Sequence, residues 1–228
     1  MIPVPGLPEV RAGDRLADLV AACAPLEDGD VVVVTQKVVS KAEGRLVDCP
    51  AGDEDARRAL VDSESVRVLR RSPGRATIVE TRHGFVCAAA GIDFSNVPDG
   101  KAALLPLDPD RSARRIRDGL LARTGRRVAV IVSDTFGRPW RRGLTDVAIG
   151  CAGIGAVLDL RGTVDGYGRT LRVTEVAVAD ELAGAAELVM GKAAGVAVAI
   201  VRGVDRSWLR ESSVRAELVR SPQDDLFR

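Results

Sequence analysis

Two aspartates lie directly after apolar, strand-like segments, and each is followed by oxygen-bearing side chains. Asp93 belongs to the segment 91–96, which reads GIDFSN, and Asp134 is followed at once by Thr135. Hard cations such as Mg²⁺ and Mn²⁺ prefer carboxylate, hydroxyl and phosphate oxygens. We therefore expect Asp93, Asp134 and Thr135 to hold a divalent metal ion together with phosphate. The alternative is that each aspartate only caps a turn.

Two groups of basic residues could bind an anionic substrate beside such an ion. Lys37 and Lys41 are four residues apart after an apolar run, and Arg138 lies in the segment 137–143, which contains three arginines. Lysine offers a point charge to a triphosphate, and the arginine fork suits carboxylates and phosphates. Gln36 could hydrogen-bond a base or a phosphate. The alternatives are a solvated helix face for the lysines and an exposed basic loop for the arginines.

The usual nucleotide-binding motifs are absent from the sequence. It contains no GxxxxGK[ST] motif, and no GxGxxG motif stands between a predicted strand and a predicted helix. Gly191 and Lys192 follow a predicted helix rather than precede one. Taken alone, this pattern favours a helix C-cap with a surface lysine. Any nucleotide site in this chain must therefore use a less common architecture.

Charge and aromatic content exclude several classes of protein. The 33 basic and 32 acidic residues leave a formal net charge of +1, without the basic excess typical of nucleic-acid-binding proteins. Four Phe, two Trp and one Tyr are too few for a base-stacking platform. No apolar run reaches the roughly 18 residues that a membrane span needs, and the N-terminus does not resemble a secretory signal. We expect a cytoplasmic protein that binds neither nucleic acid nor membrane.

Histidine and cysteine content narrows the chemistry further. His83 is the only histidine, which excludes multi-histidine zinc sites and weakens any Ser-His-Asp hypothesis. We predict that it lies in a solvated hairpin turn at 81–84. The cysteines form no CxxC pair, so we expect neither a metal finger nor a disulfide framework but reduced, buried thiols. They are Cys23, Cys49, Cys87 and Cys151.

The periodicity of apolar residues predicts the elements that position these side chains. Helices are predicted at 14–24, 36–43, 111–123 and 174–189, with a short polar helix from residue 205. A charged, periodic segment at 54–70 is expected to bury Leu60, Val61, Val66 and Leu69. Strands are predicted at 31–35, 76–80, 85–90, 127–132 and 196–201, with a strand and tight turns at 146–160. Residues 133–138 are predicted to form a loop.

These elements favour an α+β fold with mixed, largely antiparallel sheets and packed helices. The hairpin at 76–90 indicates antiparallel pairing, and strands and helices do not alternate as they do in a doubly wound sheet. The chain of 228 residues shows no internal repeat or long linker. We therefore expect one domain that spans residues 1–228.

Seven segments, taken together and in order, resemble the coenzyme F420-0:γ-glutamyl ligase family. They are residues 6–10 (GLPEV), 28–44, 91–96, 133–141 (SDTFGRPWR), 146–150 (DVAIG), 165–169 (DGYGR) and 187–192 (ELVMGK). The resemblance extends over nearly the whole chain, and the segments around Asp134 and Met190 are the most distinctive. One departure is Gln36, where the family often carries serine. Some relatives continue into a reductase-like domain, so the chain is either a stand-alone ligase or part of a two-domain enzyme.

The resemblance implies a GTP-dependent ligase with two divalent metal ions, Mg²⁺ or Mn²⁺, and a contribution from K⁺. It also implies a homodimer with an unusual α+β fold and a cleft near the dimer interface. By motif position, Asp93, Asp134 and Thr135 would hold metal. The nucleotide would meet Leu7, Pro8, Glu9, Val10, Gln36, Lys37, Lys41, Asn96, Met190, Gly191, Lys192, Ala193, Ala194, Gly195, Val196 and Ala197.

The implied reaction adds L-glutamate, through γ-linkages, to the lactyl carboxylate of F420-0 and its products. We expect the GTP γ-phosphate to convert this carboxylate into an acyl phosphate, which the glutamate amine then attacks. Phosphoryl transfer needs positioning and charge neutralisation rather than a protein nucleophile, and we assign catalytic roles to Asp134, Lys41 and Arg138. The alternatives are a non-catalytic nucleotide- and metal-binding module of a larger F420-biosynthesis enzyme, and a phosphotransferase that does not incorporate glutamate.

Overall fold

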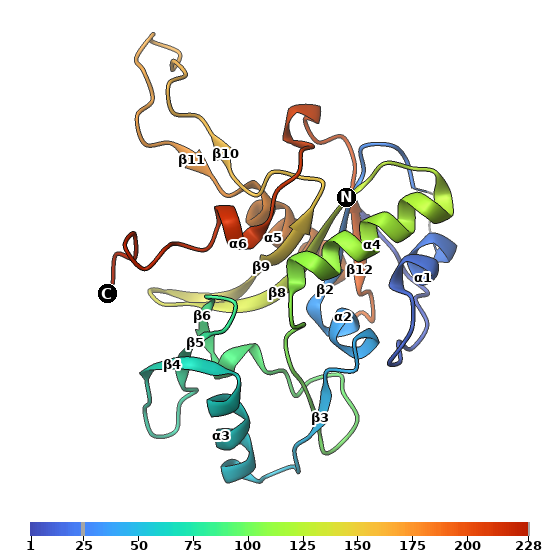
Figure 1. Cartoon of the computed structure of the whole chain (residues 1–228), viewed down its shortest axis with the longest axis vertical. Helices are drawn as coiled ribbons and strands as arrows, with labels where there is room; N and C mark the ends of the chain where they lie inside the picture. Colours follow the sequence, from blue (N-terminus) through green and yellow to red (C-terminus); the bar gives the residue numbers. More distant parts are fainter. Residues whose placement is uncertain (24–25, 228) are drawn as a thin grey trace.

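A five-stranded sheet forms the centre of the protein in a computed structural model that describes residues 1–23 and 26–227. The strand order is β1-β12-β2-β8-β9 (Figure 1). All neighbouring strands are antiparallel except β2 and β8, which are parallel. The strands are β1 (Ile2–Pro3), β2 (Val31–Thr35), β8 (Ala129–Arg138), β9 (Arg141–Ala152) and β12 (Val198–Val201).

Helices cover both faces of this sheet (Figure 1). Helices α1 (Leu16–Cys23) and α4 (Pro109–Thr124) contribute to one hydrophobic core, and α5 (Val178–Met190) contributes to the other. Side chains of β2 alternate between the two cores, because successive strand residues point to opposite faces. All four valines from Val31 to Val34 are therefore fully buried, which explains their uninterrupted apolar run.

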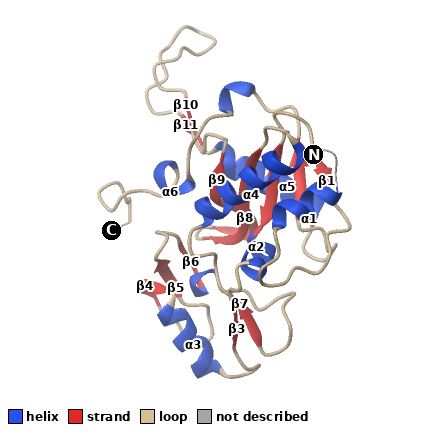
Figure 2. Ribbon diagram, turned by 45° about the vertical axis from the view of Figure 1, so that its right-hand side comes forward, coloured by secondary structure: helices blue, strands red, loops and turns tan. Residues whose placement is uncertain are grey.

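A smaller unit lies below the main sheet (Figure 2) and has a core of its own. It contains the three-stranded sheet β4-β5-β6 and the pair β3-β7. Helix α2 (Gln36–Ala42) follows β2 and precedes this unit along the chain. The elements of the unit are β3 (Leu46–Asp48), α3 (Glu54–Ser63), β4 (Ser65–Arg70), β5 (Ile78–Thr81), β6 (Val86–Ala88), the 3-10 turn η1 (Ala89–Gly91) and β7 (Lys101–Ala103).

A hairpin arm projects away from the body of the molecule (Figure 1). It is closed by β10 (Leu158–Asp159) and β11 (Glu175–Val176). Three apolar side chains of the arm are exposed: Val164 by 66%, Tyr167 by 92% and Val173 by 86%. The chain continues through η2 (Arg206–Trp208) and α6 (Val214–Glu217). No described helix is both long and apolar enough to span a bilayer.

The first turn of α4 lies directly against β9. A Cβ atom added to Gly150 would lie 2.3 Å from the backbone carbonyl of Pro109. Asp110 then joins three segments: its carboxylate accepts from the backbone N–H groups of Cys151 (2.9 Å), Val214 (2.8 Å) and Arg215 (3.1 Å). Helix α4, strand β9 and α6 are therefore fixed to one another through one buried carboxylate.

A bulge in β9 determines which way the polar residues of this hairpin point. Val132 pairs with Gly150 but Ser133 pairs with Ala148, so β9 has one extra residue at Ile149. Beyond the bulge, Asp134 is opposite Val147, and Thr135 is opposite Asp146. Because cross-strand partners share a face and strand residues alternate, Asp134 and Asp146 point to opposite faces of the hairpin.

The predicted α+β class is confirmed, with the single parallel pair β2–β8 inside otherwise antiparallel sheets. The predicted helices at 36–43, 111–123 and 174–189 correspond to α2, α4 and α5, although residues 175–176 belong to β11. The predicted helix at 14–24 corresponds to α1, and its last residue lies outside the described part. All four cysteines are free, and Cys49, Cys87 and Cys151 are buried as expected, whereas Cys23 is only partly buried.

Three predictions about local structure were wrong. The segment 133–138 is not a loop, because β8 continues through it to Arg138. Residues 65–70 form the edge strand β4, where Val66 and Leu69 are exposed by 69% and 43% rather than buried. His83 lies in the predicted turn but is not solvated: it is half-buried, and its Nε2 lies 2.9 Å from the Pro106 carbonyl oxygen.

Candidate functional site

A cavity of about 640 Å³ lies beside the part of β8 that extends past the end of β2. Strand β2 stops at Thr35, which pairs with Ser133, whereas β8 runs on to Arg138. Side chains from both faces of the β8–β9 hairpin can therefore reach the same space. The volume is in the range typical of small-molecule sites. The polar and charged lining residues are Glu9, Thr35, Gln36, Lys37, Lys41, Asp93, Ser95, Asn96, Ser133, Asp134, Thr135, Asp146, Glu187 and Lys192.

Three aspartates, Asp93, Asp134 and Asp146, line this cavity. Burial, helped by the negative charges of Asp93 and Asp146, raises the pKa of Asp134 to about 7, although the hydrogen bond from the Thr135 N–H and the charge of Lys192 act to lower it. The Cys87 thiol is beside them: burial and the charge of Asp134 raise its pKa to about 12. Cys87 is therefore not a ready nucleophile, because the thiolate is the reactive form. The site concentrates negative charge that a cation would relieve.

Asp93 is held by a strained loop. Among the described residues, the non-glycine residues with positive φ are Ala89, Ala90 and Asn96, and all three flank Asp93. Such conformations cost about 1–3 kcal/mol each and persist where the surroundings enforce them, often at functional sites. The carboxylate accepts from the Ser95 N–H at 2.7 Å.

Lys37 forms an ion pair with Asp93. Its Nζ lies 2.9 Å from the Asp93 carboxylate and 2.9 Å from the Ser95 hydroxyl. Partial burial raises the pKa of Asp93, but the hydrogen bonds from Ser95 and Lys37 outweigh it, so that the pKa is lowered. Asp93 is thus ionised at neutral pH.

Asp146 joins β8, β9 and the segment after α5, and the prediction from sequence did not include it. Its carboxylate accepts from the Ser133 hydroxyl at 3.0 Å and the Thr135 hydroxyl at 2.6 Å. Lys192 Nζ lies 2.9 Å from the same carboxylate and also contacts the Thr135 hydroxyl. Asp146 is only 3% exposed, so its position is fixed. It is a positioning residue for Thr135 and Lys192.

The lysines of α2 both point into the cavity. Lys41 is 8% exposed, and its Nζ lies 2.6 Å from the Glu9 carboxylate. Burial of a lysine is unusual without a partner, so a solvated helix face does not describe this pair. Lys192 lies across the cavity beside Asp146, and it is likewise not a free surface lysine.

A glycine-containing segment forms another wall of the cavity. Helix α5 ends at Met190. The next residue, Gly191, has a φ of +62°, and Gly195 has a φ of +67°. Left-handed backbone at both positions is accessible mainly to glycine. The lining residues of this segment are Met190, Gly191, Lys192, Ala193, Gly195, Val196 and Ala197.

Some predicted site residues are not in the cavity wall. Leu7 and Val10 pack in the main core instead. Pro8 and Ala194 are exposed and do not line the cavity. Of residues 7–10, only Glu9 lines the cavity, and the nucleotide contacts expected at the other positions stay predictions.

Arg138 and Gln36 have other partners. The Arg138 guanidinium donates to the carbonyl oxygens of Arg142 at 2.6 Å and Gly143 at 3.4 Å, so it folds onto its own hairpin tip outside the cavity. Gln36 is only 1% exposed. Its side-chain nitrogen donates to the Ser40 hydroxyl at 2.7 Å and to the Leu104 carbonyl at 3.0 Å. Gln36 lines the cavity, but its amide nitrogen fixes α2 to the smaller unit.

The donor set fits a hard divalent cation that is also bound by a substrate. Asp93, Asp134 and Thr135 offer carboxylate and hydroxyl oxygens, which Mg²⁺ and Mn²⁺ prefer. Within residues 1–23 and 26–227, no three His, Cys, Asp or Glu side chains converge closely enough to hold an ion by themselves. Mg²⁺ commonly takes one or two carboxylates from a protein and completes its shell with phosphate and water.

Replacing Asp146 by Asn tests its positioning role. The amide keeps the shape but removes the charge that holds the Thr135 hydroxyl and Lys192. Loss of such a supporting partner typically costs 10- to 100-fold in metal affinity or activity. We expect D146N to need roughly 10-fold or more Mg²⁺ for half-maximal rate, measured by a Mg²⁺ titration of turnover. Asp118→Asn, an exposed acid on α4, is the control. An unchanged Mg²⁺ dependence of D146N would exclude the role.

Comparison with known proteins gives the relatives of the chain. Residues 6–203 match the family model of F420-0:gamma-glutamyl ligase. A protein of Methanothermobacter thermautotrophicus named coenzyme F420:L-glutamate ligase is 46% identical, with 100% of this chain and 98% of the relative aligned. Proteins of the same name from Methanopyrus kandleri and Archaeoglobus fulgidus are 44% and 41% identical. Their alignments cover 99% and 100% of this chain and 96% of each relative.

Proposed function

Because the chain belongs to the F420-0:gamma-glutamyl ligase family, we propose that it joins L-glutamate to the lactyl carboxylate of coenzyme F420-0, with GTP as co-substrate. Further glutamates follow through γ-linkages. The observation that carries this proposal is the cavity in which Asp93, Asp134 and Asp146 face Lys37 and Lys192. Such a site suits a triphosphate and a second anion together, because it offers cations and metal-binding oxygens at one place.

The reaction needs activation because a carboxylate is a poor electrophile. A carboxylate oxygen of the acceptor attacks the γ-phosphorus of GTP, the bond to the β-phosphate oxygen breaks, and GDP leaves. The glutamate amine then attacks the carbonyl carbon of the acyl phosphate. Inorganic phosphate departs with the electrons of its C–O bond, and the amine loses a proton. Neither step requires a protein nucleophile, which agrees with a cavity lined by neither histidine nor cysteine.

Lysine side chains supply the charge that the transferring phosphoryl group needs. Lys37 and Lys192 each lie 2.9 Å from a carboxylate that lines the cavity, so their ammonium groups are placed where phosphate oxygens would bind. Lys41 is fixed by Glu9 and adds a third positive charge. We assign metal binding to Asp93, Asp134 and Thr135. A bound Mg²⁺ or Mn²⁺ would neutralise phosphate charge and polarise the acceptor carboxylate.

We assign the nucleotide to the wall formed by residues 190–193 and 195–197 together with Asn96 and the lysines of α2. The support is geometric, because the segment lines the cavity with small residues and its backbone can approach a ligand closely. The preference for GTP and the contribution of K⁺ come from the family resemblance.

A mass-resolved assay tests the function directly. The full chain is incubated with GTP, L-glutamate, Mg²⁺ and F420-0, and the products are separated and weighed. We expect release of GDP and phosphate together with acceptor that has gained glutamate. Nucleotide binding without turnover would indicate a binding module instead. GDP release without glutamate incorporation would indicate a phosphotransferase.

We also propose that the protein is a homodimer in which the arm contacts the partner. The arm places Val164, Tyr167 and Val173 in solvent, although large apolar side chains gathered on one extension usually mark an interaction site. We expect a dimer mass by light scattering at micromolar concentration. Tyr167→Asp combined with Val173→Asp should shift it towards the monomer. A monomeric wild type, or a double variant that stays dimeric, would contradict this assignment.

A further inference from the structure

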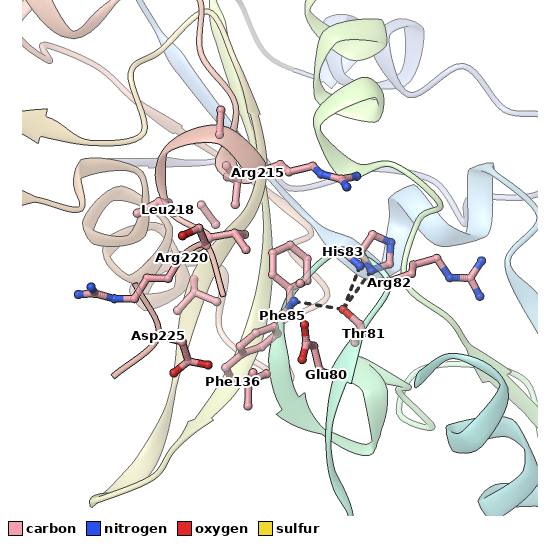
Figure 3. Close-up of a pocket in the computed structure, with 18 of the residues that line it drawn as sticks. Glu80, Thr81, Arg82, His83, Phe85, Phe136, Arg215, Leu218, Arg220 and Asp225 are labelled. Carbon is pink, nitrogen blue, oxygen red and sulfur yellow. Dashed lines mark hydrogen bonds between the residues drawn. The ribbon is translucent and has the colours of Figure 1, made fainter. Parts of the chain in front are cut away.

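A second pocket, of about 760 Å³, lies between the β5–β6 hairpin, β8–β9 and the C-terminal segment around α6 (Figure 3). We call it the aromatic pocket. No step of the proposed mechanism uses it. Its lining combines apolar and aromatic side chains with arginines at the rim. The residues that matter below are His83, Phe85, Phe136, Val147, Arg215 and Leu218.

The aromatic pocket is adjacent to the cavity of the candidate site, which is lined by Asp93, Asp134 and Asp146 and which we call the carboxylate cavity. Val147 lines the pocket and is the cross-strand partner of Asp134, so their Cα atoms are about 4.5–5.5 Å apart. Phe136 also lines the pocket and is two residues from Asp134 on the same face of β8, which is about 7 Å along the strand. The pocket therefore begins close enough to the Asp134 carboxylate for one elongated ligand to reach both.

Three rings give the pocket the chemistry of a site for a flat aromatic group. Phe85 and Phe136 meet edge to face with centroids 6.1 Å apart, and His83 stacks on Phe85 at 5.5 Å. Such arrangements leave ring faces and edges available for offset stacking with a further ring. His83 is fixed by the Pro106 carbonyl, and burial lowers its pKa, so a neutral ring is presented at neutral pH.

Arg215 supplies a positive charge at the rim. Its backbone N–H is anchored on the buried Asp110, whereas its guanidinium makes no ion pair with any described residue. Figure 3 shows this side chain extending from α6 towards the His83 side of the pocket. A guanidinium held beside an apolar pocket is suited to an anionic group on a ligand.

We propose that the aromatic pocket binds the ring system of the acceptor, with Arg215 on its anionic chain. The ligand class is a flat, fused aromatic ring joined to a chain that ends in a carboxylate, and a deazaflavin acceptor belongs to this class. With its ring in the aromatic pocket, the acceptor would have its terminal carboxylate beside Asp134. The reacting end would then lie in the carboxylate cavity. This proposal rests on the function proposed above, since it concerns the acceptor of that reaction.

The test compares Arg215→Ala and Phe136→Leu with the wild type and with Arg115→Ala, an exposed arginine on α4 outside both cavities. Initial rates give KM for F420-0 and for GTP separately, and deazaflavin fluorescence measures F420-0 binding without nucleotide. We expect R215A and F136L to raise the Kd and KM for F420-0 about tenfold, which corresponds to ~1.4 kcal/mol. Their KM for GTP should stay unchanged, and R115A should match the wild type.

The possible results separate the two proposals. Wild-type glutamylation with an unchanged F420-0 KM in R215A and F136L would overturn the aromatic pocket as acceptor site and leave the ligase function standing. A raised KM for GTP with an unchanged KM for F420-0 would assign the pocket to the nucleotide and also overturn it. No glutamylation by the wild type would overturn the function itself, and the pocket assignment with it. Arg215 is exposed, so its loss should leave the fold intact.

Discussion

Asp134→Asn should reduce glutamylation by at least about 10³-fold, because it removes a charge from the group that we assign to the metal and the transferring phosphate. The amide has the same shape, so the hairpin should stay folded. GDP release and glutamate incorporation should fall together, as expected if phosphoryl transfer comes first. Asp118→Asn serves as the matched control on an exposed helix surface. Near-wild-type turnover by D134N would show that Asp134 does not serve the reaction.

We expect the same substitution to stabilise the protein while it reduces activity. A stability measurement therefore distinguishes a loss of catalysis from a loss of folding. Burial, helped by Asp93 and Asp146, raises the pKa of Asp134 to about 7, whereas an unfolded aspartate has a pKa of about 3.9. In metal-free protein, this group's contribution to stability falls as pH rises from about 4 to about 7, because only the unfolded chain ionises it freely.

D134N lacks this titration. We therefore expect the free energy of unfolding of D134N, measured with urea and a chelator, to exceed that of the wild type at pH 8, with a much smaller difference below pH 4. Equal stability at both pH values would mean that the ionised carboxylate is not disfavoured in the folded protein. Excess Mg²⁺ should shrink the gap at pH 8, because the ion stabilises only the wild-type carboxylate.

Gly150→Ala should destabilise the protein by about 3 kcal/mol or more, because overpacking costs typically 1–3 kcal/mol and here the clash is with backbone. The new Cβ would lie 2.3 Å from the Pro109 carbonyl and 2.6 Å from the Asp110 nitrogen. Helix α4 would have to move off β9, which would break the Asp110 contacts to Cys151 and Val214. We expect Tm to fall by roughly 10 °C in a thermal melt.

Gly137→Ala on the same hairpin is the control for Gly150. A Cβ atom at Gly137 would meet no atom within 4 Å, and its φ is not in the left-handed region. Its melting temperature should therefore stay close to that of the wild type. A Tm for G150A equal to that of G137A would mean that α4 is not held against β9 as closely as the structure places it.

The sequence predicted the core better than the polar strands. Val31–Val34 formed an unmistakable buried strand because every side chain is apolar and both faces are covered. The edge strand Ser65–Arg70 was misread because the prediction continued the periodic segment before it and made Val66 and Leu69 core residues, whereas the strand leaves both exposed. The prediction of a loop at 133–138 was also wrong. Beyond β2, strand β8 has a neighbour on one side only and lies beside the cavity, so its residues are polar and resemble a loop.

That misreading also explains the missed member of the site. Asp93 and Asp134 were identified because each follows an apolar run, and the structure brings both to one cavity. Asp146 does not follow such a run. Its role depends on lying opposite Thr135 across a hairpin, and a hairpin can be inferred only if 133–138 is read as strand. Pairing the polar residues on either side of the Pro139–Trp140 turn would have shown this.

The extra residue at Ile149 has a consequence for how this hairpin can change over evolution. If Ile149 paired with Ser133 and the register of Val130–Val132 continued, Phe136 rather than Thr135 would oppose Asp146, and both aspartates would point the same way. At present Asp134 lies near Asp93, and Asp146 pairs with Lys192 on the opposite face of the hairpin. This arrangement would be lost. A single insertion or deletion between Ile149 and the hairpin tip could thus abolish the chemistry while leaving every charged residue in the gene.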